Sequence, residues 1–295
     1  MPVSRYIKNG ISFFIYSNLF IAFCVCAYTA KTTLLLYGNN GSPLVNSFVF
    51  SATLLFYCFH RVNKIKFLTP GENMEERNNW MSGHRPVYYT FIILCSITLL
   101  VELFFMPLRA WVVFIPVGIL GVGYTFPIIP SKKGMKRLRD IYWLKIVWIS
   151  LAFSWLTTFL PVIFIEPVST LLKPSALFIF CRSFLFLFAV CMPFDIRDMQ
   201  FDKQRGVNTL PVSIGAKTST YISITVLLIF ISLVCTQFLY FGLDFKVATA
   251  LFISAFLTIA LLPLANKKRP AVLFPLLYDG SMLVQWILVL LFTHF

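Results

Sequence analysis

Apolar residues occur along the chain in long runs that short polar or Pro/Gly-containing breaks separate. The runs cover residues 11–36, 44–62, 87–106, 110–126, 141–165, 174–194, 218–241, 246–265 and 271–292. Most are close to the ~20 residues that a helix needs to cross a bilayer, and the first is too long for a cleaved signal sequence. The pattern predicts an all-α, polytopic membrane protein with about nine transmembrane helices in one bundle, and residues 1–295 as a single domain.

Composition and charge agree with this interpretation. Hydrophobic residues make up 59% of the chain and charged residues 12%, about half the charge of a soluble domain. The net charge of +14 does not indicate a nucleic-acid partner, because the basic residues lie in short loops between apolar runs. With the N-terminus in the cytoplasm, inside segments hold 19 Lys and Arg and outside segments hold 4, Lys31 among them. We therefore predict an integral membrane protein, in the plasma or inner membrane if bacterial, with its C-terminus on the opposite side.

One polar stretch, residues 195–215, concentrates negative charge. Asp195, Asp198 and Asp202 stand at positions i, i+3 and i+7, so they share one face of a helix. Three carboxylates on one face repel one another unless a positive group lies between them. That group is either a divalent cation, which carries a phosphate with it, or the interleaved basic residues Arg197, Lys203 and Arg205.

The same stretch, DIRDMQFDKQRGVNTLPVSIG, resembles the second Asp-rich motif of the UbiA-type intramembrane prenyltransferases. The matching residues are Asp195, Asp198, Asp202, Gly206, Thr209, Leu210, Pro211, Val212 and Gly215. A second segment, GVGYTFPIIPSKK, is similar to the family's segment after its fourth helix and contains Tyr124 and Lys132. Nine helices with a cytoplasmic N-terminus also agree with this family.

The resemblance implies transfer of a prenyl group from a Mg²⁺-bound prenyl diphosphate to an aromatic or other lipid-pathway acceptor. Carboxylate-held Mg²⁺ neutralises the leaving group, and apolar helices keep water from the allylic cation. Asp198 and Asp202 are the expected metal ligands, with Asp195 as a third ligand or a supporting partner. The expected substrate contacts are Tyr57, Tyr124, Lys132, Arg197, Lys203 and Arg205. The expected partners are the prenyl diphosphate, the hydrophobic acceptor and membrane lipid, with no nucleic acid and no protein partner.

The sequence departs from the family at the end of the second run. The first Asp-rich motif should stand there, but the chain has YCFHRVNKI, which contains Arg61 and Lys64 and no carboxylate. Two interpretations follow. In the first, Arg61 is a catalytic residue and, together with Lys64, neutralises the diphosphate directly. In the second, the site no longer ionises its substrate. Both residues are also compatible with ordinary anchoring on the cytoplasmic side. The downstream Glu72, Glu75, Glu76 and His84 are better explained as solvated loop residues than as replacement ligands.

Charged residues inside the runs suggest further alternatives. Arg182 is deep in the sixth run, and we expect it to form an ion pair with Asp279 or Glu102. Lys145 is expected to extend toward the cytoplasmic surface.

Besides a transferase, the sequence permits a non-catalytic family member that binds an isoprenoid or phosphate-bearing lipid. It also permits a transporter that uses Arg182, Glu102 and Asp279, although that leaves the three aspartates unexplained.

Overall fold

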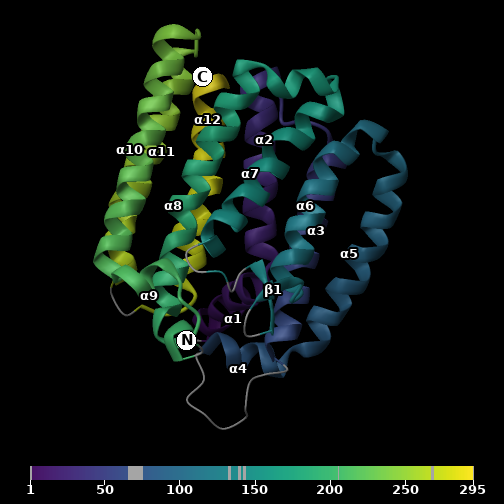
Figure 1. Cartoon of the computed structure of the whole chain (residues 1–295), viewed down its shortest axis with the longest axis vertical. Coiled ribbons are helices and arrows are strands. Elements are labelled where there is room, and N and C mark those ends of the chain that lie inside the picture. The colour runs from purple at the N-terminus through teal and green to yellow at the C-terminus, as the bar shows by residue number, and fades with distance from the viewer. Residues whose placement is uncertain are drawn as a thin grey trace.

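Long helices that run along a common axis make up nearly the whole structure (Figure 1). The computed structural model describes residues 2–65, 76–131, 134–138, 141, 144–204, 206–266 and 269–294. Among these residues, nine helices are long and apolar enough to cross a membrane. They coincide with the nine apolar runs, which confirms the predicted all-α membrane fold.

The spanning helices are α2 Leu19–Tyr37, α3 Pro43–Ile65, α5 Arg85–Phe105, α6 Trp111–Thr125, α7 Leu144–Ile165, α8 Pro174–Gln204, α10 Ala216–Tyr240, α11 Phe245–Leu261 and α12 Gly280–His294. A 3-10 turn, η1 Leu108–Ala110, leads into α6, and a second, η4 Leu262–Asn266, continues α11. A π-helical turn, η5 Pro275–Asp279, leads into α12. The shorter elements are α1 Pro2–Tyr16, α4 Glu76–Gly83, η3 Val168–Leu172, α9 Leu210–Ile214 and an antiparallel hairpin of β1 Ile129–Ser131 and β2 Gly134–Lys136.

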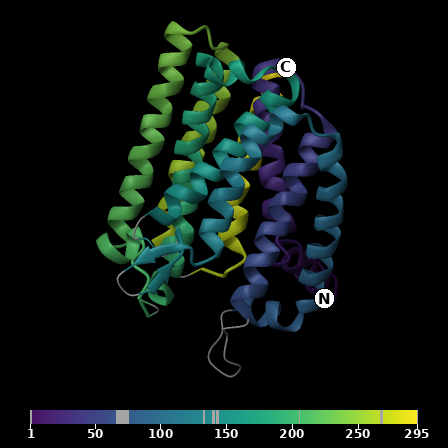
Figure 2. The same cartoon turned by 45° about the vertical axis from the view of Figure 1, so that its right-hand side comes forward.

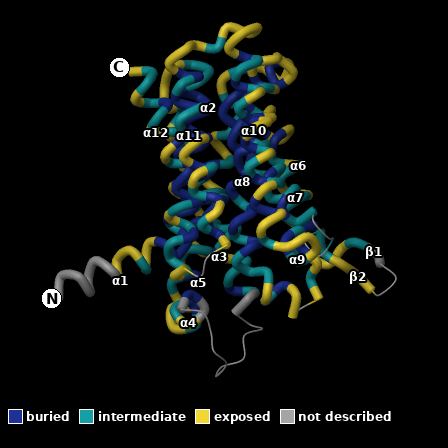
Figure 3. Tube along the Cα trace, turned by 90° about the vertical axis from the view of Figure 1, so that its left-hand side faces the viewer, coloured by how far each residue is buried: buried dark blue, intermediate teal, exposed yellow. Residues whose placement is uncertain are grey.

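Helix α2 lies at the centre of the bundle and packs against α3, α7 and α12. Helix α8 packs between α7 and α10, and α11 packs between α10 and α12. Apolar side chains on the outer helices face outward instead; on α5 these include Leu100, 62% exposed, and Phe104, 87% exposed. Figure 3 shows buried residues along the axis and exposed ones around it. Exposed apolar surface of this extent suits a lipid environment.

The short elements α1, α4, α9 and the β1–β2 hairpin gather at one end of the bundle, which we call the basic end (Figures 1 and 2). The chain begins at this end and finishes at the other. The first apolar run is divided here into α1 and α2, because Asn18 adopts a left-handed conformation, φ 69°, between the two helices. Asparagine tolerates that conformation better than most residues. Helix α8 is longer than its apolar run and continues through the polar sequence to Gln204.

Two predictions about charges inside the bundle are wrong. Among the described residues, no ion pair joins Arg182 to Asp279 or to Glu102, although Arg182 is only 3% exposed. For Asp279 the reason is depth, because it lies near the basic end whereas Arg182 lies in the part of α8 near the opposite end. For Glu102 the reason is lateral position, because α5 packs chiefly against α3, whereas α8 packs between α7 and α10. Lys31 is not in an outside loop but is buried in α2, where its Nζ donates to Gln285 Oε1 at 2.9 Å.

Candidate functional site

A cavity of about 1060 Å³ opens at the basic end of the bundle. Side chains from α3, α6, α7, α8 and η5 line it, together with Asn18 between α1 and α2, Arg77 of α4 and Arg137 directly after β2. Among the described residues in this lining, five are cations and four are carboxylates. We call the α8 side the acidic wall and the α3 side the basic wall.

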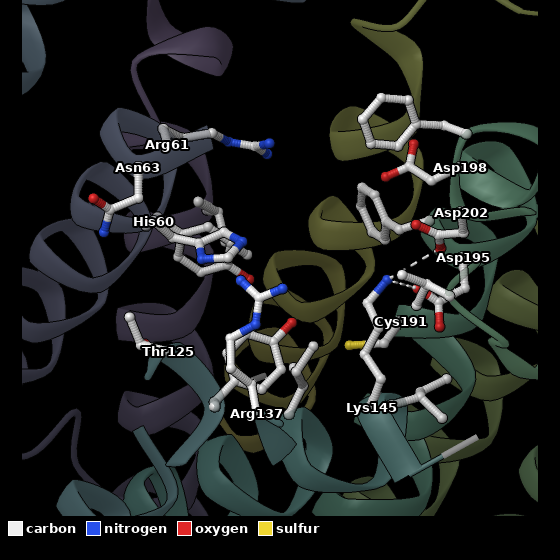
Figure 4. A pocket seen from close by; sticks show the side chains of 18 of the residues that line it. His60, Arg61, Asn63, Thr125, Arg137, Lys145, Cys191, Asp195, Asp198 and Asp202 are labelled. Atoms are coloured by element: carbon white, nitrogen blue, oxygen red, sulfur yellow. Dashed lines mark hydrogen bonds and ion pairs between the residues drawn. The ribbon is translucent and has the colours of Figure 1, made fainter. Parts of the chain in front are cut away.

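The acidic wall consists of Asp195, Asp198 and Asp202, which α8 presents on one face, as their spacing predicts. Asp195 and Asp202 are buried, at 6% and 9% exposure. The Lys145 ammonium group lies between them. Its Nζ donates to Asp195 Oδ1 at 2.6 Å and lies 3.6 Å from Asp202 Oδ2 (Figure 4).

The third carboxylate of the acidic wall pairs with its own neighbour in sequence. Arg197 holds Asp198 with two bonds, Nε to Oδ1 at 2.7 Å and Nη2 to Oδ2 at 3.1 Å. The Arg197 guanidinium carbon also lies 5.4 Å from the ring centre of Phe194 and 5.3 Å from that of Phe274. Two aromatic rings and a bidentate carboxylate therefore fix the direction of this guanidinium group.

The basic wall comes from the last turns of α3 and contributes Tyr57, His60, Arg61 and Asn63 to the lining. No Asp or Glu occurs anywhere in α3. In Figure 4 the side chain of Arg61 extends from α3 toward Asp198 on the opposite wall. The cavity therefore has cations on both sides but carboxylates on the α8 side and not on α3.

The structure brings seven of the predicted site residues to this cavity: Tyr57, Arg61, Tyr124, Asp195, Arg197, Asp198 and Asp202. Lys203 is exposed and does not line it. Lys132 and Arg205 lie outside the described residues, as do Glu72 and Glu75. Lys64 belongs to α3, but its side chain is outside the described part of the structure. The roles assigned to these residues stay predictions.

Four charged lining residues were not expected at the site: Arg77, Arg137, Lys145 and Asp279. Lys145 does not extend to the surface, because Asp195 and Asp202 hold its ammonium group. Asp279 ends the π-helical turn η5, is 9% exposed and makes no ion pair among the described residues. A π turn in an otherwise α-helical segment often occurs at a functional site, and this was a feature that sequence periodicity could not indicate.

The donor set at the acidic wall fits one Mg²⁺ ion that shares its coordination with a phosphate group. Magnesium usually binds through one or two carboxylates plus phosphate oxygens and water. Asp202 Oδ2 is buried and accepts no hydrogen bond, so it is a candidate ligand oxygen. Within the described residues, no group of three or more His, Cys, Asp or Glu side chains converges as a complete metal site. A divalent ion held by these carboxylates would therefore need phosphate oxygens or water to complete its coordination.

The protein is a helical membrane protein with an aspartate-lined cavity at one end of its bundle. The model of the UbiA prenyltransferase family matches residues 84–283, about two thirds of the chain, and the chain belongs to this family. No curated protein matches the chain.

Solved structures share the fold at low sequence identity. A UbiA homologue from Archaeoglobus fulgidus bound to GPP and Mg²⁺ is 14% identical, with a TM-score of 0.62 over 96% of this chain and 98% of that one. A UbiA homologue from Aeropyrum pernix K1 in its apo form is 11% identical, with a TM-score of 0.59 over 93% and 94%. A digeranylgeranylglyceryl phosphate synthase structure is 16% identical, with a TM-score of 0.55 over 97% of both chains.

Proposed function

We propose that this protein is an intramembrane prenyltransferase that moves a prenyl group from a prenyl diphosphate to an aromatic or other lipid-pathway acceptor. The proposal treats residues 1–295 as one catalytic domain, because solved UbiA homologues cover almost the whole chain. The observation that carries the proposal is the cavity itself, in which Arg61 faces Asp195, Asp198 and Asp202 in a chain of the UbiA family. The proposal extends to this chain the GPP and Mg²⁺ bound by the Archaeoglobus fulgidus homologue.

The diphosphate would lie between the two walls. Arg61 can grip two phosphate oxygens from the α3 side, because a guanidinium group presents its donors as a planar fork. Asp198 and Asp202 would hold Mg²⁺ against the diphosphate from the α8 side. When bound, Mg²⁺ supplies charge neutralisation for the departing diphosphate.

The prenyl tail would follow the apolar part of the lining, which includes Ile21, Ile146, Ile149 and Phe194. These side chains exclude water from the carbon that carries the diphosphate. Tyr57 and Tyr124 also line the cavity and can stabilise positive charge on that carbon through their rings. The C–O bond breaks with its electrons going to the diphosphate, the acceptor forms the new bond to carbon, and the acceptor loses a proton.

Binding measurements test this proposal before any acceptor is known. Geranyl diphosphate titrated into the detergent-solubilised protein should bind, and Mg²⁺ should strengthen the binding. Asp198→Asn and Asp202→Asn should each remove the gain that Mg²⁺ gives. A wild-type protein that binds no prenyl diphosphate with Mg²⁺ present would overturn the proposal.

A second candidate is a family member that binds an isoprenoid or phosphate-bearing lipid without transferring it. It is favoured by the basic wall, since α3 offers no carboxylate to a second metal ion. Mass spectrometry of lipids that co-purify with the protein, followed by incubation with candidate acceptors, separates the two. A single prenylated product selects the transferase.

A transporter has less support, because Asp279 lines the cavity whereas Arg182 and Glu102 do not.

A further inference from the structure

Lys145 occupies a position that is unfavourable on local grounds. It is the second residue of α7, whose bounds are Leu144–Ile165. A helix begins with unpaired N–H groups and the positive end of its dipole, so a cation in the first turn is disfavoured by its own helix. Its partners come from another helix, since Asp195 and Asp202 both belong to α8. The packing of α7 against α8 therefore offsets a local electrostatic cost.

The ammonium group has room for one more acceptor. Lysine has three N–H donors. One bonds Asp195 Oδ1 at 2.6 Å, and Asp202 Oδ2 is within 3.6 Å. The Lys145 side chain is 19% exposed and lines the cavity, so a phosphate oxygen entering between the walls can reach it. Lys145 can thus contact the substrate without leaving its aspartates.

The charges of the lining also limit how many divalent ions the site needs. Five cations and four carboxylates leave the described lining with at least one excess positive charge. A prenyl diphosphate carries about three negative charges near neutral pH. One divalent ion is then enough to offset the remaining negative charge, whereas two would leave a larger surplus of positive charge in a poorly solvated cavity.

We propose that Lys145 is a resident counter-cation of the diphosphate site. Its ammonium group stays between Asp195 and Asp202, takes the place of one divalent ion, and bonds the diphosphate through its remaining donor. This inference rests on the proposed function, because it concerns the same pocket and substrate. The diphosphate therefore binds with no more than one divalent ion, and it binds measurably with none.

Calorimetric titration with geranyl diphosphate in detergent, with Mg²⁺ and again with EDTA, tests this directly. The wild-type affinity in EDTA should stay within about tenfold of that in Mg²⁺, because Lys145 and Arg61 remain. Lys145→Met should weaken binding in EDTA by about thirtyfold or more, while Lys145→Arg keeps most of it. Lys217→Met is the matched control, an exposed lysine in the first turn of α10, and should bind as the wild type does.

A second readout needs no diphosphate. Removing the ammonium group leaves Asp195 and Asp202 without their cation, so Lys145→Met should bind Mn²⁺ about tenfold more tightly than the wild type, measured by electron paramagnetic resonance. If Lys145→Met does not fold, the double variant Lys145→Met/Asp195→Asn removes one buried carboxylate with the lysine. It should still lose binding in EDTA.

The possible results distinguish a failure of the proposed role of Lys145 from a failure of the proposed function. If the wild type binds geranyl diphosphate with Mg²⁺ but not with EDTA, the role of Lys145 is wrong and the proposed function stands. Equal binding in EDTA by the wild type and a folded Lys145→Met variant also overturns the role of Lys145. If the wild type binds in neither buffer, the proposed function itself fails.

Discussion

The two walls of the cavity differ in how each can hold a negatively charged phosphate group. On the acidic wall, Asp195, Asp198 and Asp202 each have a cation from the protein within 3.6 Å. On the basic wall, α3 brings Arg61 and no carboxylate. A carboxylate wall holds a phosphate only through a cation, whereas a guanidinium group holds it directly. The protein itself therefore supplies positive charge on both walls of the pocket.

Removing Arg61 should have the largest effect, because it takes the positive charge from the basic wall. Arg61→Ala should weaken geranyl diphosphate binding by about a hundredfold, since a charge-assisted bond contributes about 1.5–3 kcal/mol. Arg61→Lys should recover part of the loss, because it restores charge without the bidentate fork. Calorimetry in Mg²⁺ measures both variants. Binding by Arg61→Ala equal to that of the wild type would contradict a direct role for the basic wall.

Placing a carboxylate on the basic wall should reduce the difference between the two sides. Asn63 lines the cavity near the end of α3, so Asn63→Asp adds a negative charge there with little change in size. Binding in EDTA should fall about tenfold, and the gain from Mg²⁺ should increase, because a divalent ion now has a ligand on both sides. The ratio of the two affinities is the measurement. An unchanged ratio would show that the charge of the α3 wall does not decide metal dependence.

Neutralising Asp279 should act in the opposite direction. This carboxylate lines the cavity and forms no ion pair among the described residues, so in its ionised form it repels an incoming diphosphate. Asp279→Asn keeps the shape and removes the charge, and affinity in EDTA should rise about three- to tenfold when measured at a pH at which Asp279 is ionised. Weaker binding by this variant, at unchanged thermal stability, would mean that Asp279 supports the substrate in another way.

Lys203 should matter least, although it is the residue next to Asp202 in the stretch that resembles the family's second Asp-rich motif. Its side chain is exposed and does not line the cavity. Lys203→Met should change geranyl diphosphate affinity by less than about threefold, since an exposed charge is screened by solvent and salt. The same titration measures it beside Arg61→Ala. A large loss would return Lys203 to the site and weaken the contrast between lining and exposed cations.

The sequence was sufficient to predict the bundle and the acidic wall. Runs of apolar residues define spanning helices without reference to their neighbours, and Asp195, Asp198 and Asp202 share a face because helical periodicity requires it. The break at Asn18 escaped prediction, because the apolar run continues through it and a single left-handed residue leaves no periodic signal. The apolar run ends at residue 194, and only the i, i+3, i+7 spacing of the aspartates indicated that the helix continues beyond it; the end of α8 at Gln204 was not predicted.

The sequence could not predict which charged side chains from different helices form ion pairs or line the same cavity. Lys145 precedes Asp195 by 50 residues, and only the packing of α7 against α8 places its ammonium group 2.6 Å from that carboxylate. Asp279 enters the cavity through a π-helical turn. The predicted ion pairs of Arg182 failed because sequence gives neither depth nor neighbours reliably. Asp279 lies at a different depth in the bundle, and Glu102 belongs to α5, which packs chiefly against α3.

The most direct test of the account is to count the divalent ions in the complex. Crystals grown with geranyl diphosphate and Mn²⁺ allow each ion to be located by its anomalous scattering. The account predicts one Mn²⁺ peak beside Asp202, a diphosphate that reaches Arg61, and Lys145 still between Asp195 and Asp202. Two Mn²⁺ peaks between the walls, with Lys145 displaced from its aspartates, would contradict it.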